Sequence, residues 1–346
     1  MAGGSRCCPE LTKVKFKQQS FCCFFIFVIC RIKKIIMAKK ISTLRKFASL
    51  AEGLKAFGGP PPQHPLITVL NGIDSSLEFN PPSESHVLSY YKIAFRPNIG
   101  GLLRYGQTHF DYNEGGLFFA APNQILSPDE NRLQEPGCSG REAVILMHPD
   151  FLLNSPLAAK IKKYEFFSYA VNEALHLSDK EKQIILGLIR NIEEELNNRI
   201  DELSQDVVLA QIELLLNYAQ RFYKRQFITR KAINSTLLEK FEQLLNEHFD
   251  DEKKSDKGIP TVQHLAERLA ISSGYLSDML RTLTGQNAQQ HIHDKLIEKA
   301  KEKLSNTDLS VSEIAYELGF EHLQSFSKLF KSKTNQTPLK FRAGFN

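Results

Sequence analysis

Cysteine is nearly absent from most of this 346-residue chain. Five of the six cysteines lie in the first 30 residues, and only Cys138 lies beyond them. A small secreted domain held together by disulfides would have cysteines throughout its fold. The distribution therefore excludes that class and indicates a protein of the reducing cytoplasm, in which Cys138 is a structural or loop thiol.

Long hydrophobic runs are also lacking. Residues 21–30 form an apolar run between basic flanks, but ten residues are too few to span a bilayer. The run has the length of a signal-peptide core, yet no small-x-small cleavage site follows it. Met37 then begins a segment, MAKKISTLRK, that would serve as a bacterial start. We expect residues 1–36 to be an extension that is disordered or not part of the native protein, with a membrane anchor as the alternative.

Motifs for catalysis and metal binding are missing as well. The chain has no Gly-rich phosphate loop, no Gly-x-Ser-x-Gly and no Cys-x-x-Cys. A metal cupin needs a His-x-His, a following Glu and a later His, because a catalytic metal takes three or four converging ligands. His109, with Asp111 and Glu114, comes nearest, and we interpret His109 as an ordinary strand residue. His291 and His293 have the spacing but lie in a predicted helix, where residues two apart do not face each other. We expect no catalytic residue, no metal site and no cofactor.

The net charge of +5 does not by itself indicate a nucleic-acid partner. Residues 1–36 hold seven Lys and Arg and one Glu, so the rest of the chain carries about −1. Residues 322–346, in contrast, contain five Lys and Arg and no Asp or Glu. Such a run is either a solvated face or a surface that contacts phosphates.

Residues 309–341 have the pattern of two short helices joined by a tight turn. Ser310 and Glu313 form a capping box, and Gly319 follows the first helix, where glycine adopts the left-handed conformation at little cost. Apolar residues at helical spacing mark both helices: Ile314, Ala315, Leu318, Leu323, Phe326 and Phe330. This is a helix-turn-helix, whose second helix lies in the major groove of DNA.

A second unit of the same kind lies upstream. Thr261 caps a helix, residues 270–272 form the turn, and Ser273 opens a second helix that Gly285 closes. A long helix over residues 288–304 joins the two units, because its apolar residues recur every four positions. The C-terminal third of the chain is therefore predicted to be all helical.

The middle of the chain begins after a proline- and glycine-rich linker at residues 57–65. Short β-type runs follow, separated by turn signals of Gly, Pro, Asn and Asp. The candidate strands are residues 66–70, 86–95, 102–110, 116–120 and 143–148. Several short strands at this spacing indicate a small barrel or jelly roll.

From about residue 156 the pattern is helical. One apolar stripe consists of Ile185, Leu188, Ile192 and Leu196; a second, at 4-3-4-3 spacing, consists of Val208, Ile212, Leu215, Ala219 and Phe222. The second spacing is that of a coiled-coil seam, so this helix either packs on its own barrel or forms a dimer interface. Residues 234–249 are predicted to form a further helix, and the polar segment 250–258 a linker.

The C-terminal motifs resemble the signature of AraC-type (AraC/XylS family) transcription regulators, which contain two helix-turn-helix units in tandem. The elements that carry the resemblance are Glu313-Ile314-Ala315, Gly319-Phe320, Phe326-Ser327, Phe330-Lys331 and Pro338-x-x-Phe341-Arg342. Their order and spacing match the family, and the resemblance covers residues 261–342. Asn335 stands where the family usually has glycine, and asparagine tolerates the left-handed conformation that this turn needs.

The resemblance and the strand pattern together imply an α+β chain. An N-terminal small β-barrel or cupin-like domain with flanking helices would precede an all-α domain with tandem helix-turn-helix units. We place the extension at residues 1–36, a cupin-like sensor and dimerisation domain at 37–230, a helix and linker at 231–258, and the DNA-binding domain at 259–346.

We therefore predict a cytoplasmic, sequence-specific DNA-binding regulator with recognition helices at residues 273–284 and 322–332. The second helix should read more bases, because Gln324 can pair with adenine and Lys328 with guanine. The predicted DNA-contacting residues are Ser273, Gly274, Ser277, Asp278, Arg281, His322, Leu323, Gln324, Ser327, Lys328, Lys331 and Arg342.

The resemblance also implies partners other than a double-stranded DNA operator. These are a small-molecule effector bound to the N-terminal domain, RNA polymerase if the protein is an activator, and a second copy of the chain. The dimer would form through Val208, Ile212, Leu215, Ala219 and Phe222; no membrane partner is implied. Two alternatives remain: an N-terminal half that only dimerises, and a cupin-type metalloenzyme fused to a DNA-binding domain.

Overall fold

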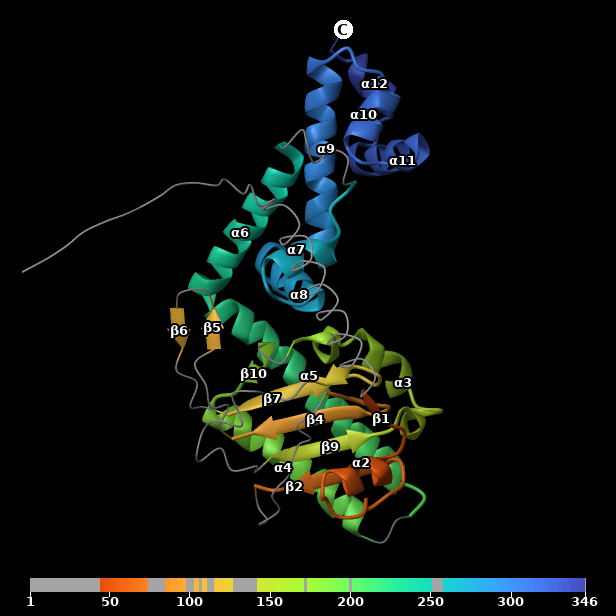
Figure 1. Ribbon diagram of the computed structural model, residues 1–346. Coiled ribbons are helices and arrows are strands. Elements are labelled where there is room, and N and C mark those ends of the chain that lie inside the picture. The colour runs from red at the N-terminus through yellow and green to blue at the C-terminus, as the bar shows by residue number, and fades with distance from the viewer. Residues whose placement is uncertain are drawn as a thin grey trace, which may run out of the picture. The chain divides into compact units, whose positions relative to one another are not determined.

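The computed structural model describes residues 44–73, 85–97, 103–105, 108–110, 115–126, 142–170, 173–198, 201–250 and 258–345. Its compact unit from residue 46 to residue 346 contains the elements discussed below (Figure 1). The expectations for residues 1–36, for Cys138, Asp111 and Glu114 and for the side chain of His109 lie outside the described part of the chain.

A five-stranded antiparallel sheet is the centre of the N-terminal half. Its order is β10-β7-β4-β9-β2, made of Leu175–His176, Gly116–Ala120, Tyr91–Arg96, Ala143–Met147 and Ile67–Asn71. Strands β1 (Arg45–Phe47), β3 (His86–Leu88) and β8 (Ile125–Leu126) form a second sheet, and β5 (Leu103–Tyr105) pairs with β6 (Thr108–Phe110). In the central register, Ile93 of β4 lies between Phe119 of β7 and Ile145 of β9.

The predicted strands match these elements closely. Three of the five predicted segments differ from an observed strand by at most one residue at each end, and the segments 86–95 and 102–110 are each split into two strands. Strands β1, β8 and β10 were not predicted, because runs of two or three residues are too short to show an alternation. The α+β class is confirmed. The strands that the structure describes form open sheets and no closed barrel, so the cupin barrel is not confirmed.

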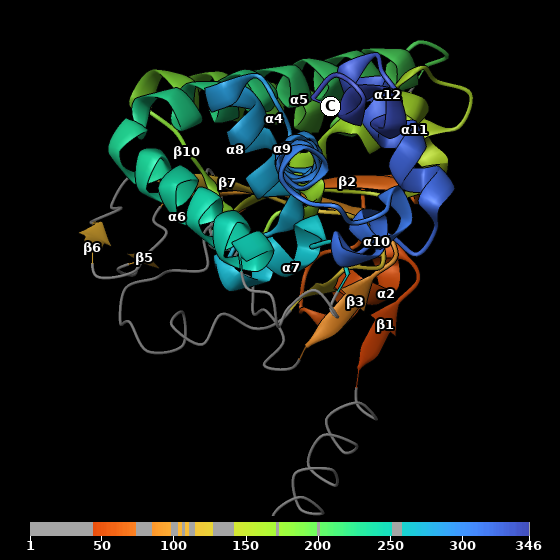
Figure 2. The same cartoon turned by 90° about the horizontal axis from the view of Figure 1, so that it is seen from above.

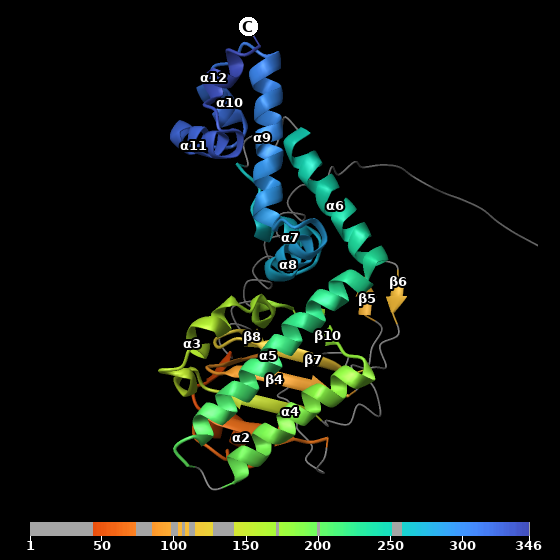
Figure 3. The same ribbon diagram turned by 180° about the vertical axis from the view of Figure 1, so that it is seen from behind.

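Both faces of the large sheet are buried. Successive side chains of each strand point to opposite faces, so each strand contributes to both layers of the core. Ile145 and Met147 of β9 point to the side covered by α4 (Asp179–Asn197) and α5 (Ser204–Thr229), which cross the sheet in Figure 3. Val144 and Leu146 belong to a smaller cluster on the other side, with Phe47 and α2 (Leu50–Ala56). A short helical segment between β9 and β10 includes η1 (Pro149–Leu152), α3 (Leu157–Lys160), η2 (Ile161–Lys163) and η3 (Glu165–Ser168).

The seam predicted on α5 is buried inside the chain itself. None of its five side chains is more than 5% exposed: Val208, Ile212, Leu215, Ala219 and Phe222. They pack in the main core with α4 and the sheet, which is the alternative to a dimer interface that the sequence left open. The apolar residues that α5 does expose are Val207, Leu214 and Ile228, which are 40%, 45% and 57% exposed and lie at multiples of seven residues.

Seven helices follow α5 in the described part of the chain, and α9 is the central one. They are α6 (Lys231–Asp250), α7 (Val262–Arg268), α8 (Ser273–Thr284), α9 (Ala288–Asn306), α10 (Val311–Glu317), α11 (Leu323–Thr334) and α12 (Pro338–Arg342). Figure 2 looks down α9 and shows α6 on one side of it and α10, α11 and α12 on the other. Both predicted helix-turn-helix units are present as α7–α8 and α10–α11.

Local sequence explains where these helices begin and end. The Ser310 and Glu313 capping box is formed, with both reciprocal hydrogen bonds present. Gly285 ends α8 at φ +80°, and Asn335 ends α11 at φ +59°, so the left-handed turn expected at Asn335 is confirmed. The turn of the first unit is less usual, because Ala270 adopts φ +56° where the second unit has Gly319 at φ +85°.

Two absences concern only the part of the chain that the structure describes. None of those helices combines the length and the apolar character that crossing a bilayer requires. The same residues contain no group of three or more His, Cys, Asp or Glu side chains placed to hold a metal ion.

Candidate nucleic-acid interface

Helix α11 has one apolar face and one polar, basic face. Phe326 and Phe330 are almost fully buried, and their rings contact each other and those of Phe320 and Phe341. A spacing of four residues puts these rings on one side of a helix. Gln324, Lys328 and Lys331 are exposed on the rest of the helix surface, and His322 is exposed at its N-cap. All four are predicted DNA-contacting residues.

Several lysines of this region are available for phosphates. Lys328, Lys331 and Lys340 make no ion pair with any residue that the structure describes, whereas Lys333 forms one with Asp294 at 2.7 Å. A lysine already held by a carboxylate contributes less to an anion site than one whose ammonium group is surrounded by water. The positive charge is therefore concentrated on the outer side of α11.

Three other predicted residues of this unit have packing roles. Leu323 and Ser327 are half-buried, and Leu323 packs against the main core. Arg342 donates a hydrogen bond of 3.2 Å from Nε to the carbonyl of Leu304, near the end of α9. The carbonyl groups at a helix end lack partners within the helix, so this arginine fastens α12 to α9.

Helix α8 is built in the same way, but its polar face is partly covered. Tyr275, Leu276, Met279 and Leu280 point into the core. The hydroxyl group of Ser272 accepts a hydrogen bond from the backbone N–H of Tyr275 and so caps the helix. Of the residues predicted to contact DNA, Gly274, Asp278 and Arg281 lie against the segment that contains η3, whereas Ser273 is exposed.

The N-terminus of α8 is held by a buried carboxylate. The backbone N–H and the hydroxyl group of Ser272 donate to the two carboxylate oxygens of Glu173, over 2.6 and 2.5 Å. Glu173 is 3% exposed, and burial raises the pKa of its carboxyl group while the hydrogen bonds from Ser272 lower it. A carboxylate at the positive end of a helix dipole is also favourable. Glu173 therefore binds α8 to the N-terminal half of the chain.

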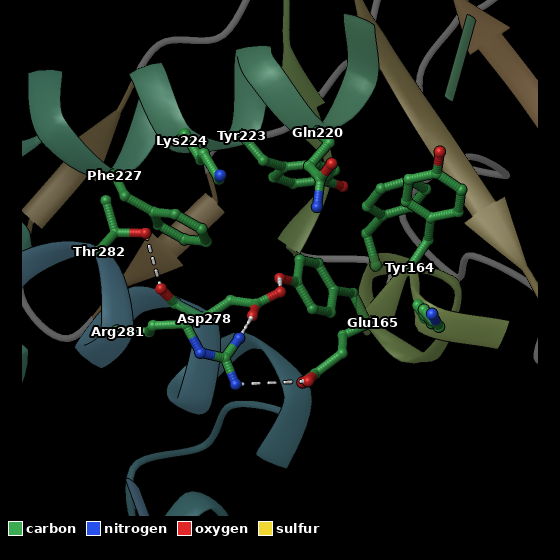
Figure 4. A pocket seen from close by; sticks show the side chains of 12 residues that line it. Tyr164, Glu165, Gln220, Tyr223, Lys224, Phe227, Asp278, Arg281 and Thr282 are labelled. Carbon is green, nitrogen blue, oxygen red and sulfur yellow. Dashed lines mark hydrogen bonds and ion pairs between the residues drawn. The ribbon is translucent and has the colours of Figure 1, made fainter. Parts of the chain in front are cut away.

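One turn further along α8, Asp278 makes a second link. The hydroxyl group of Tyr169 donates a hydrogen bond of 2.7 Å to Oδ2 of Asp278, and Arg281 donates one of 2.5 Å to Oδ1 (Figure 4). Arg281 also lies 3.8 Å from the carboxylate of Glu165. Burial, and then the charge of Asp278, raises the pKa of Tyr169 well above its usual value and that of Glu165 above its own.

Glycine at position 274 permits the close approach of the two segments. A Cβ atom there would lie 2.8 Å from Oγ of Ser168 and 3.5 Å from the carbonyl oxygen of Glu165. A side chain at position 274 would therefore require a shift of α8 or of Ser168, whose hydroxyl group donates to the carbonyl of Glu165. Gly274 was predicted to face DNA from its position in the motif, and in this structure it lies against η3.

Aromatic rings complete the contact. Tyr275 of α8 meets Tyr169 and Phe227 edge to face, with ring centroids 5.4 and 5.1 Å apart. Tyr223 contacts Tyr169 at 5.2 Å and donates to the carbonyl of Glu173 over 3.3 Å. Such ring pairs each add about 0.5–1.5 kcal/mol beyond the area that they bury. Helix α8 and the N-terminal half thus share one packed core.

The sequence predicted the residues of α8 and α11 but not their partners. Tyr169, Glu173 and Glu165 were missed, because they contact residues about a hundred positions away and no local pattern marks them. Asp278 gave a hint, since an acidic residue on a helix predicted to enter DNA calls for a partner. Ser273 is exposed and Ser277 is half-buried, so neither is held as Asp278 is.

Comparison with known proteins agrees with this C-terminal architecture. Residues 265–344 match a family model described as a helix-turn-helix domain. An uncharacterised HTH-type transcriptional regulator of Bacillus subtilis, YfiF, is 23% identical over 266 residues, which are 75% of this chain and 78% of that one. The HTH-type transcriptional activator RhaS of Escherichia coli is 28% identical over 152 residues, so the match covers 44% of this chain and half of RhaS.

Solved structures also resemble this chain. The C-terminal domain of the two-component response regulator yesN from Fusobacterium nucleatum is 34% identical; it covers 30% of this chain and 93% of its own, with a TM-score of 0.26. The DNA-binding domain of AdpA, solved in complex with a target DNA, is 24% identical and covers 32% of this chain and 91% of its own, with a TM-score of 0.28.

Proposed function

This chain belongs to the AraC/XylS family of helix-turn-helix transcription regulators, and we propose that it recognises one DNA sequence through α11 and α8 in successive major-groove segments. Recognition helices in tandem read segments roughly one helical turn apart. The observation that carries the proposal is the outer face of α11, which presents exposed Gln324, Lys328 and Lys331 in a stretch without acidic residues.

The proposed contacts with bases and those with phosphates have different consequences. Gln324 offers an amide that pairs with the N6 and N7 edge of adenine, and Lys328 donates to O6 and N7 of guanine. Lys331 and Lys340 lie at positions suited to phosphates, which supply affinity without sequence information. His322, Leu323 and Ser327 complete the groove-facing surface of α11. Arg342 contributes through α12 and its anchor on α9.

Helix α8 is the second reader in this proposal. Ser273, Gly274, Ser277, Asp278 and Arg281 would face the DNA. Because η3 and Tyr169 occupy that face in the structure, α8 must separate from the N-terminal half before it can enter a groove. Helix α11 carries more of the base readout, and α8 adds to it once it is released.

We assign a sensing and dimerising role to the N-terminal domain, residues 37–230. Its two sheets enclose an apolar cluster, as a cupin-like domain would, and it holds α8 by the contacts above. A small molecule that changes these contacts would change DNA binding, and an activating form would in addition contact RNA polymerase. A homodimer would form on the exposed side of α5, since the predicted seam is buried.

Selection of binding sites from random double-stranded DNA by the full chain tests the proposal. We expect one enriched motif. Gln324→Ala and Lys328→Ala should each weaken binding to it by about 1–3 kcal/mol and relax the preference at one or two base pairs. Lys333→Ala is the matched control, because its ammonium group is already paired with Asp294, and it should leave the motif unchanged. Binding without sequence preference, or equal losses in all three variants, would contradict the proposal.

A further inference from the structure

A cavity lies where α5, η3 and α8 meet (Figure 4). Its volume is about 150 Å³, which is about the space that accommodates one benzene ring in a protein interior. Five aromatic residues line it: Tyr164, Phe166, Tyr169, Tyr223 and Phe227. Its polar lining includes Glu165, Gln220, Lys224, Asp278 and Arg281.

The aromatic side is rigid. Phe166, Tyr169, Tyr223 and Phe227 are each at most 5% exposed. The rings of Phe166 and Tyr223 are stacked with centroids 5.6 Å apart, and those of Tyr223 and Phe227 are stacked at 6.3 Å. A preformed surface of stacked and edge-to-face rings favours a planar ring as ligand, since ring faces and edges pair well.

The charged residues on the polar side of the cavity differ in whether they already have an ion-pair or hydrogen-bond partner. The carboxylate of Asp278 accepts from Tyr169 and Arg281, and the carboxylate of Glu165 lies beside Arg281. Lys224, in contrast, makes no ion pair with the part of the chain that the structure describes. Figure 4 shows Lys224 and Gln220 extending from α5 on the side of the cavity opposite α8. Lys163, which also lines the cavity, makes no ion pair with the described residues either. The cavity therefore offers two cations and an amide to a ligand, while its anions are already occupied.

We propose that this cavity binds a compact aromatic anion, with its ring on the aromatic side and its carboxylate at Lys224, and that the bound molecule keeps α8 from DNA. The regulatory half of this inference rests on the proposed DNA-binding function. A cationic ligand fits less well, because it would have to displace Arg281 from Asp278 and Glu165.

Ligand binding and DNA binding are linked because α8 forms part of the cavity wall. Asp278, Arg281 and Thr282 belong to α8, so the cavity is complete only when α8 lies against η3. The first two residues are also among those proposed to face DNA. A ligand that contacts both walls binds only the closed arrangement, in which α8 lies against η3. The ligand therefore weakens DNA binding, and bound DNA weakens ligand binding by the same factor.

Three probes of equal size and different charge test the ligand class on the full chain: benzoate, benzamide and benzylamine, with sodium acetate as the control for added anion. Titration calorimetry without DNA should show benzoate binding about fivefold more tightly than benzamide, as one partly exposed ion pair of about 1 kcal/mol would give, and benzylamine binding most weakly. Lys224→Gln should abolish the preference for benzoate over benzamide. Lys180→Gln, an exposed lysine on α4, should keep it.

Any other order overturns the ligand assignment: equal affinity of benzoate and benzamide, tightest binding of benzylamine, or no binding of any probe at millimolar concentration. The second step adds labelled operator DNA. Saturating benzoate should lower the DNA affinity of the full chain at least threefold, whereas acetate should not. Benzoate binding with unchanged DNA affinity overturns the linkage. Because the first step uses no DNA, a chain that fails to bind an operator would refute the proposed function and leave the ligand result readable.

Discussion

The phenolic oxygen of Tyr169 lies 2.7 Å from Oδ2 of Asp278, although the two residues are 109 positions apart in the sequence. Tyr169 follows η3 in the N-terminal half, and Asp278 is on the polar face of the first recognition helix. One hydrogen bond therefore joins the domain that we propose to sense to the helix that we propose to read DNA. It also accounts for an aspartate on a surface that would otherwise face phosphates.

The contacts around this hydrogen bond are suited to the release and return of α8. Hydrogen bonds to charged groups stabilise a folded protein by about 1.5–3 kcal/mol each, and neutral ones by about 1 kcal/mol. The α8 contact has three such bonds to carboxylates, from Tyr169 and twice from Ser272, together with a few ring contacts. A balance of a few kcal/mol is within the range that a ligand or an operator can shift.

The exposed side of α5 gives the first prediction. Val207→Glu with Leu214→Glu should convert a dimer into a folded monomer, because both residues are exposed apolar side chains seven positions apart. Analytical ultracentrifugation measures the change, and circular dichroism checks the fold. An unchanged dimer would remove α5 from the interface.

The matched change on the buried side should behave differently. Ile212 is fully buried, so Ile212→Glu places an unpaired charge in the core and should unfold the domain, since such burial costs several kcal/mol. A folded monomer from Ile212→Glu would mean that the buried seam is an interface after all.

The turn of the first helix-turn-helix unit can be improved. Ala270 has φ +56°, and a left-handed conformation costs a residue with a Cβ atom about 1–2 kcal/mol. Ala270→Gly removes that cost and adds some entropy to the unfolded chain, so it should stabilise the protein by roughly 0.5–1 kcal/mol. Urea unfolding of the purified chain measures the gain.

Gly285→Ala is the opposite substitution at a left-handed position, because φ is +80° and no atom lies within 4 Å of the added Cβ. It should cost about 1–2 kcal/mol of stability. Destabilisation of the protein by Ala270→Gly would contradict this explanation of the turn.

Acid should destabilise the N-terminal half through His176. Burial, and then the charges of Arg230 and Arg225, lowers the pKa of His176 to about 3, whereas an unfolded chain has a histidine pKa near 6.5. Between about pH 6.5 and pH 3 the unfolded state binds the proton and the folded state does not, so stability is complete above that window and falls as the pH drops through it.

The contribution of this one group can be isolated by substitution. His176→Gln removes the titrating ring, so the loss of stability between pH 7.5 and pH 5 in urea should be smaller by up to about 1.4 kcal/mol per pH unit than in the wild-type chain. Equal losses in the two proteins would show that His176 titrates normally.

The C-terminal architecture could be predicted because its signals are local. Ser310 with Glu313, Gly319 and Asn335 each determine a cap or a turn within a few residues of themselves, and the structure places them as expected. The strands were predicted nearly as well, since alternation and turn residues are local too. The seam on α5 shows the limit: its spacing shows that one face is apolar, but spacing alone does not identify what covers that face.

The part of the candidate site that the sequence did not predict is the contact between distant segments. Glu173 has an ordinary sequence context, and its role follows only from the folding of β10 and α5 beside α8. Gly274 could have indicated a close approach by its lack of a side chain, although nothing in the sequence names Ser168 as the group that approaches. Contacts of this kind depend on the packing of whole elements.

The central claim is that α11 binds DNA while α8 is held by the N-terminal half. Hydroxyl-radical footprinting on the selected operator tests it directly, with the wild-type chain compared with Glu173→Gln and Tyr169→Phe. Thr282→Val is the control, because the hydroxyl group of Thr282 bonds only within α8, to the carbonyl of Asp278. We predict that the wild-type chain and Thr282→Val protect one major-groove segment strongly, and that the two releasing variants protect a second segment about 10 base pairs away as well. Equal protection of both segments by the wild-type chain, with no change in the variants, would contradict the account.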